Sequence, residues 1–218
     1  MSTNQQPLFK HIAGGHNMEM AQTTTDKKIH PILFSGEMVR AILSGQKTQT
    51  RRVCKPAEKA GLSFITTADA GGMTPETNAD IATWGDEEGE VIFTCPYGRV
   101  GDRLWVREAW ALGDDGEYAY RADYPYPDGR WKPSIHMPRK ASRILLEIES
   151  VWVERLWAIS SADCREEGCP GGHGSIPGYG YSAQPKEHYF WLWDKINGKD
   201  ASKANPWVWA IQFLQVQP

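Results

Sequence analysis

The segment SRILLEIESVWVERL, residues 142–156, is the feature that most restricts the fold. Ile144, Leu146 and Ile148 recur at every second position, and Val151 and Val153 resume this spacing after a shift of one position. A period of two places alternate side chains on opposite faces of a sheet. We therefore expect this segment to be the longest strand of the fold, or a bent pair of strands.

Shorter elements flank this strand. IHPILF (29–34) is typical of a strand. After it, Ser35 can cap a helix whose apolar residues recur at helical spacing, and Gly45 is expected to end that helix. GDRLWVREAW (101–110) is typical of a strand that follows a Gly-Asp turn, and GEYAYRADY (116–124) is typical of a further strand. Ser160 and Asp163 form a capping-box pattern before a short helix, and a second helix precedes the terminal strand PWVWAIQFLQV (206–216). The connections are too short for repeated parallel crossovers, so the sequence predicts an α+β fold, mostly antiparallel, with a small closed or nearly closed β-barrel and flanking helices.

The 218 residues are expected to form one domain with insertions. Residues 1–28 lack periodicity and are expected to be a disordered extension, whereas residues 55–92, rich in Pro, Gly and Thr, are expected to be an insertion of loops with a short hairpin. The domain then covers residues 29–218. The sequence contains no apolar run long enough to cross a membrane and no secretory signal pattern, which favours a cytoplasmic protein without membrane contact.

The net charge of −3 disfavours bulk DNA binding, because contact with nucleic acid would need a local basic patch. The four cysteines contain no Cys-x-x-Cys pair, so free thiols are expected. Cys164, Cys169 and His173 come close together in the sequence, but their spacing fits no common zinc pattern and no fourth ligand is evident. We therefore expect no metal and no cofactor.

The stretch GQKTQTRR, Gly45 to Arg52, places reactive side chains at a predicted helix-to-strand junction. A threonine hydroxyl becomes a nucleophile when a neighbour takes its proton, and a lysine can do so when burial lowers its pKa. Lys47 and Thr50 are such a pair, although an exposed turn lysine beside a backbone-bonded threonine has the same spacing.

GQKTQTRR resembles the Gly-x-Lys-x-x-(Glu/Thr)-x-Arg signature of the ASCH domain, a β-barrel family related to the PUA RNA-binding fold. Gly45, Lys47, Thr50 and Arg52 occupy its four positions. GDRLWVREAW, PSIHMPRKASRILLEI and VERLWAIS are also similar to segments of the larger ASCH proteins often encoded by phages and prophages. The resemblance runs from about residue 29 to the C-terminus.

Within that family, the small bacterial N4-acetylcytidine amidohydrolase uses a lysine, a threonine three residues later and a glutamate after the long strand. The resemblance thus implies a triad of Lys47, Thr50 and Glu167, with Glu166 as the alternative one register away. Either Lys47 accepts the Thr50 proton and the alkoxide attacks the acyl carbonyl, or Glu167 activates a water while protonated Lys47 holds the oxyanion. This chain is about twice as long as the small enzyme, so its insertion and its Gly-rich loop could reshape the pocket.

Several further residues are candidates for substrate binding. Arg52 would orient Glu167 or the substrate carbonyl, or else fix the turn through a salt bridge. Trp105, Arg107 and Glu108 leave one predicted strand and could stack on and hydrogen-bond a pyrimidine, with core packing as the alternative for Trp105. His136 and Arg139 precede the long strand and could form the pocket rim, where a structural histidine is equally reasonable.

Two classes of function follow. The first is a metal-independent amidohydrolase that converts N4-acetylcytidine, or another acylated cytidine or cytosine, into the free amine and acetate. The second is an RNA-binding module or ribonuclease, because KTQTRR and PRKASR place basic residues beside aromatic ones. The expected partners are a small nucleoside substrate and, in the second class, RNA.

Overall fold

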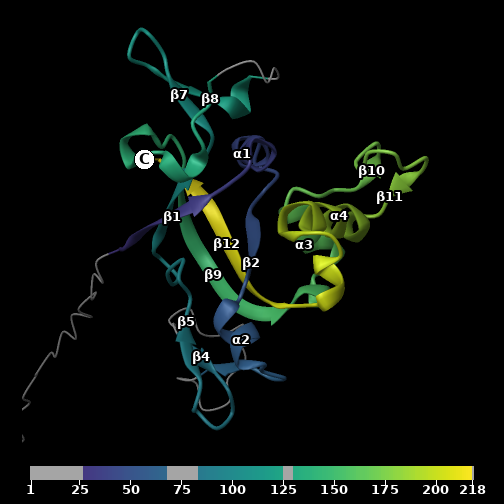
Figure 1. The fold of residues 1–218 in the computed structure, drawn as a ribbon. Coiled ribbons are helices and arrows are strands. Elements are labelled where there is room, and N and C mark those ends of the chain that lie inside the picture. Colours follow the sequence, from purple (N-terminus) through teal and green to yellow (C-terminus); the bar gives the residue numbers. More distant parts are fainter. Residues whose placement is uncertain (1–26, 68–82, 125–129, 218) are drawn as a thin grey trace, which may run out of the picture.

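The computed structural model describes residues 27–67, 83–124 and 130–217, and it contains a five-stranded sheet with helices on both sides (Figure 1). The expected N-terminal extension lies outside the described residues, apart from Lys27 and Lys28. The strands run in the order β1-β6-β9-β12-β2. Their bounds are Ile29–Leu33 for β1, Gln49–Val53 for β2, Arg103–Arg107 for β6, Leu145–Arg155 for β9 and Trp207–Val216 for β12.

The sheet is mixed and open. β1 pairs with β6 in parallel, and β6, β9, β12 and β2 pair in antiparallel fashion. The mainly antiparallel α+β class is as expected, but the closed or nearly closed barrel is not: β1 and β2 are the two edges of this sheet and do not pair in the described part of the chain. Pro31 in the middle of β1 has no N–H to donate, which suits an edge strand.

β9 and β12 form the longest ladder of the sheet. Ten residue pairs join them, and the register shifts between Gln212 and Phe213. The alternating segment thus forms one long strand. Gln212 pairs with Ser150 and Phe213 pairs with Ile148, so Glu149 is an extra residue in β9, and this irregularity accounts for the change of face seen in the sequence.

Smaller elements extend from the main sheet. The stretch 55–92, where loops with a short hairpin are expected, contains helix α2 (Lys55–Ala60), and its residues 68–82 lie outside the described ranges. β3 (Thr66–Thr67), β4 (Thr83–Gly85) and β5 (Ile92–Thr94) form a small antiparallel sheet of their own. β7 (Trp110–Leu112) pairs with β8 (Tyr118–Tyr120), and β10 (Gly172–His173) pairs with β11 (Ser182–Ala183). In Figure 1, β4 and β5 lie below the long strands, β7 and β8 lie above them, and β10 and β11 lie beside α4 on the right.

The main core lies on one face of β12. Trp209 is fully buried there, in edge contact with Trp84 and Phe93 at ring-centroid distances of 4.8 and 5.8 Å. Helix α1 (Gly36–Leu43) covers this core with Val39 and Ile42. The small β3–β4–β5 sheet is thereby anchored to the main sheet by aromatic packing.

A second, smaller core lies on the opposite face of β12. Val208 packs there with Tyr189 and Trp193 of α4 (Pro185–Asn197) and with Cys164 of α3 (Ser161–Glu166). Ile196, near the end of α4, is 51% exposed and takes no part in this core. The strand pair β2–β12 therefore separates the two cores, and α3 and α4 cover the second one.

Among the described residues, no helix is both long enough and apolar enough to cross a bilayer.

Candidate active site

The turn from α1 into β2 is fixed by its backbone. Gly45 adopts a left-handed conformation with φ of 72°, and the amides of Gln46 and Lys47 both donate to the carbonyl of Ala41, at 2.8 and 2.9 Å. A residue with a side chain would be strained at this position, which explains the glycine. The turn places Lys47 directly before the edge strand β2.

Helix α3 brings Glu167 to the same edge. Ser160 and Asp163 form the predicted capping box at its start, and Glu167 is its C-terminal cap. The amide of Thr48 donates to the carbonyl of Glu166 at 2.8 Å, and Lys47 and Glu167 form an isolated antiparallel bridge. Backbone pairing thus joins the end of α3 to the start of β2.

The side chains of Lys47 and Glu167 are in direct contact. Lys47 Nζ donates to Glu167 Oε2 at 2.6 Å and to the Glu167 carbonyl at 2.9 Å. The Lys47 side chain has no exposed surface and that of Glu167 is 5% exposed. Burial lowers the pKa of Lys47, although the Glu167 carboxylate opposes this effect. A buried amine held against a buried carboxylate is an arrangement suited to proton transfer.

Arg51 is the residue of this cluster that the sequence analysis missed. Its side chain is fully buried, and it donates to Glu154 Oε1 at 2.6 Å and to Gln49 Oε1 at 3.1 Å. Its guanidinium also lies 3.4 Å from Glu167 Oε1 and 3.7 Å from Asp163 Oδ2. The carboxylate of Glu167 is therefore held between two cations, Lys47 on one oxygen and Arg51 on the other.

The two neighbouring glutamates have different partners. Glu166 Oε2 accepts a hydrogen bond from Gln49 Nε2 at 2.5 Å, whereas Glu167 faces Lys47 and Arg51. Only the Glu167 carboxylate therefore lies against the amine of Lys47.

Thr50 is not joined to this contact by a hydrogen bond. The residue is fully buried, and its Oγ1 has no hydrogen-bond partner within the described chain. Thr50 pairs with Ile211 across the sheet, while Arg51 pairs with Ala210. Because paired residues of antiparallel strands share a face, Thr50 points into the main core and Arg51 toward α3.

Arg52 contacts backbone and an aromatic ring. It donates to the carbonyl of Leu33 at 2.7 Å and to that of Arg51 at 3.4 Å, and its guanidinium lies 5.2 Å from the centre of the Phe34 ring. The ring of Phe34 is also 5.8 Å from Lys47 Nζ. In the described residues it is Arg51, and not Arg52, that contacts Glu167.

The other predicted binding residues lie away from Glu167. Trp105 and Arg107 alternate with the buried Leu104 and Val106 of β6, so they occupy the outer face of the sheet, where the Arg107 guanidinium lies 5.2 Å from the Trp105 ring. Trp105 and the exposed Arg139 line a surface pocket of about 460 Å³ together with Lys140.

Glu108 and His136 have separate surroundings. Glu108 is 1% exposed and accepts two hydrogen bonds from Arg143, at 2.9 and 3.1 Å. Burial raises the pKa of its carboxyl group despite the arginine. His136 is exposed in a short 3₁₀ turn.

A cavity of about 330 Å³ opens beside Glu167, within the size range of small-molecule sites. Glu167 and Gly168 form one part of its wall, and His188 and Trp191 of α4 form another. Burial lowers the pKa of His188, and its Nδ1 is buried without a partner in the described structure. These α4 residues were not predicted, because a histidine and tryptophan on a helix also fit simple packing.

Cys164 and Cys169 are buried free thiols, and His173 is exposed on β10. No group of three or more His, Cys, Asp or Glu residues in the described ranges is arranged to hold a metal ion.

Comparison with known proteins yields two solved structures. The first, from Lactobacillus crispatus JV V101, aligns with 88% of this chain and 81% of its own, with 13% identity and a TM-score of 0.37. It is an ASCH domain. The second, a DUF984 protein from Enterococcus faecalis V583, aligns with 87% of this chain and 76% of its own, with 8% identity and a TM-score of 0.39.

No protein-family model matches the sequence, and no curated protein is significantly similar to it. One of the two similar structures is thus an ASCH domain, but TM-scores below 0.5 support no conclusion about activity. The function is therefore proposed below from the resemblance of GQKTQTRR to the ASCH signature and from the geometry around Glu167.

Proposed function

We propose that the protein is a metal-independent amidohydrolase that cleaves the N4-acyl amide of an acylated cytosine nucleoside or nucleotide, with Glu167 as general base and then general acid. The observation that supports this best is the buried Glu167 carboxylate, which lines a cavity and is held 2.6 Å from Lys47 Nζ. A carboxylate fixed by two cations beside a space for a small molecule can take a proton from water and return it to a leaving group.

The reaction follows from those roles. Glu167 takes a proton from a water molecule in the cavity, and the water oxygen attacks the acyl carbon. The C–N4 bond breaks as the proton on Glu167 passes to the departing amine, which leaves free cytosine N4 and the carboxylic acid. Lys47 is fully buried and is not part of the cavity wall, so its two hydrogen bonds to Glu167 serve to position the carboxylate and do not reach the acyl group.

The position of Thr50 favours attack by water over attack by threonine. Thr50 is fully buried in the main core, and it is not part of the wall of the cavity beside Glu167. A threonine nucleophile would need direct access to the acyl carbon. In this mechanism Thr50 contributes packing at the junction of β2 and the core.

The test is hydrolysis of N4-acetylcytidine by chelator-treated protein, followed by chromatography of cytidine. We expect Glu167→Gln to lower kcat by about 100-fold or more, in the range for loss of a general base, and the matched variant Glu166→Gln to keep activity within about threefold. Thr50→Val should retain activity. Loss of turnover in Thr50→Val, with a covalent acyl-enzyme detected in the wild type, would instead assign the attack to threonine.

A second candidate function is binding of single-stranded RNA, favoured by the outer face of β6. Trp105, Arg139 and Lys140 surround the 460 Å³ pocket, and neither basic residue has a carboxylate within 4 Å in the described ranges. An aromatic ring flanked by cations suits stacking of a base beside its phosphate. A gel-shift assay with unstructured RNA tests this, and Trp105→Ala should weaken binding without changing hydrolysis.

A further inference from the structure

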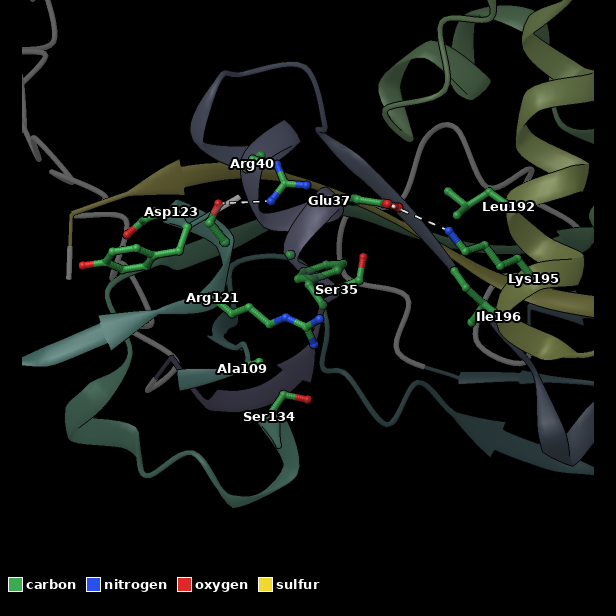
Figure 2. Close-up of a pocket in the computed structure, with 14 residues that line it drawn as sticks. Ser35, Glu37, Arg40, Ala109, Arg121, Asp123, Ser134, Leu192, Lys195 and Ile196 are labelled. Atoms are coloured by element: carbon green, nitrogen blue, oxygen red, sulfur yellow. Dashed lines mark hydrogen bonds and ion pairs between the residues drawn. The ribbon is translucent and has the colours of Figure 1, made fainter. Parts of the chain in front are cut away.

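A second cavity, of about 780 Å³, adjoins the one that contains Glu167. Both have Glu37 of α1 and Leu192 and Lys195 of α4 in their walls, so they lie on either side of the same contact between these helices. Figure 2 shows the Glu37–Lys195 ion pair at this border, with a distance of 3.8 Å. A ligand longer than an acylated base could therefore extend from one cavity into the other.

The larger cavity is also connected to Lys47 and Glu167 through Phe34. Phe34 forms part of its wall, and the ring centre lies 5.8 Å from Lys47 Nζ, which in turn contacts Glu167 at 2.6 Å. The cavity therefore begins two side-chain contacts away from the proposed catalytic carboxylate.

The polar wall of the larger cavity has an excess of positive charge. Its cations are Arg40, Arg121 and Lys195, and its carboxylates are Glu37 and Asp123. Both carboxylates are already paired: Glu37 with Lys195 at 3.8 Å, and Asp123 with Arg143, from outside the wall, at 2.7 and 2.9 Å.

The two remaining arginines are available to an anion. Arg40 donates only to the carbonyl of Ala122, at 3.1 Å, and Arg121 makes no side-chain hydrogen bond or ion pair among the described residues. In Figure 2 the side chain of Arg121 reaches into the cavity. A guanidinium offers paired N–H donors that match a phosphate group.

We propose that the larger cavity binds the phosphate of the substrate through Arg121 and Arg40, so that the protein acts on a phosphate-bearing acylcytidine, free nucleotide or RNA residue, in preference to the free nucleoside. This inference rests on the proposed hydrolase function. The phosphate group is common to both sources, and the choice between them is left to the substrates compared below.

The experiment compares kcat/KM for N4-acetylcytidine, its 5′-monophosphate and a short single-stranded RNA with one internal N4-acetylcytidine. We expect at least one phosphate-bearing substrate to exceed the nucleoside by about tenfold or more, as for one or two charge-assisted hydrogen bonds. Whichever of the monophosphate and the RNA has the higher kcat/KM identifies the source of the phosphate.

Arg121→Ala should lower kcat/KM for the preferred phosphate-bearing substrate by about tenfold and change the nucleoside value by less than about twofold, while Arg121→Lys recovers part of the loss. The matched control is Lys59→Ala, an exposed cation on α2, which Figure 1 shows at the opposite end of the sheet from α1. Lys59→Ala should leave kcat/KM for all three substrates unchanged, and circular dichroism checks that each variant is folded.

The outcomes separate the two proposals. Equal rates on all three substrates, unaffected by Arg121→Ala, would overturn the phosphate site and leave the hydrolase intact. If no substrate is cleaved, the hydrolase proposal fails, and calorimetry with cytidine 5′-monophosphate then tests the phosphate site separately. Binding that Arg121→Ala weakens would support the phosphate site, and absence of binding would refute it.

Discussion

Replacement of Arg51 by methionine removes the cation on which Glu154, Glu167 and Asp163 converge, while keeping most of the side-chain volume. Removal of one partner from a buried ion pair costs about 3–5 kcal/mol, because the charge that remains is left without compensation. Glu167 keeps Lys47, and the side chains of Glu154 and Asp163 are 19% and 26% exposed, so they can regain some water. We therefore expect a loss of about 3 kcal/mol.

Urea unfolding followed by tryptophan fluorescence measures this loss. With a slope of about 2 kcal/mol per molar urea, the midpoint at neutral pH should fall by about 1.5 M. The matched control is Arg52→Met, which removes the same charge from the next residue, where no carboxylate lies within 4 Å in the described chain. We expect the control to cost about 1 kcal/mol, because only one of the two hydrogen bonds that Arg52 donates to backbone carbonyls, the one to Leu33 at 2.7 Å, is short.

The loss should also depend on pH. Burial raises the pKa of Asp163, but hydrogen bonds from Ser160 and the charge of Arg51 together hold it below its ordinary value. A lowered folded-state pKa contributes stability that is present above the unfolded pKa of about 3.9 and is lost as the pH falls through the folded value. The difference between wild type and Arg51→Met should therefore narrow below about pH 4. A midpoint equal to that of wild type at neutral pH would refute the assignment of Arg51 as the shared counter-ion.

Three further predictions concern stability. Because the folded-state pKa of Glu108 is raised, its contribution is present below about pH 4.3 and is lost as the pH rises through the folded value, so urea titrations should show a pH slope in the wild type that Glu108→Gln removes. Ser160→Ala deletes the N-terminal cap of the helix that is capped at its other end by Glu167, and it should lower the free energy of unfolding by about 1 kcal/mol, measured as a lower Tm. Trp209→Ala should cost about 3–5 kcal/mol in urea unfolding, because the ring is fully buried between two other aromatic rings, and a cost below 1 kcal/mol would contradict that packing.

The main elements of this fold could be predicted from local patterns. The alternation in residues 142–156 corresponds to β9, and the Ser160–Asp163 capping box and the stop at Gly45 are formed as expected. Each depends on residues close together in the sequence, for which side-chain period and backbone freedom determine the structure. The catalytic roles of Lys47, Thr50 and Glu167 remain predictions.

Other features depend on contacts between distant segments. Strand alternation requires Arg51 and Arg52 to point to opposite faces of β2, but it does not say which face receives α3, so the sequence could not identify Arg51 as the neighbour of Glu167. For the same reason the sequence could not show that Trp105 faces outward from β6. It also could not show whether the barrel closes, because closure depends on pairing between the distant strands β1 and β2.

The pairing of α3 with β2 has a consequence for aggregation. The exposed N–H and C=O groups of an edge strand can recruit a strand from another molecule, and the end of α3 covers the beginning of this one through the Thr48–Glu166 hydrogen bond. Transient detachment of that short helix would withdraw Glu167 and uncover the edge in a single event. Inactivation and self-association should therefore rise together on mild heating, and faster amide exchange at Thr48 should precede both.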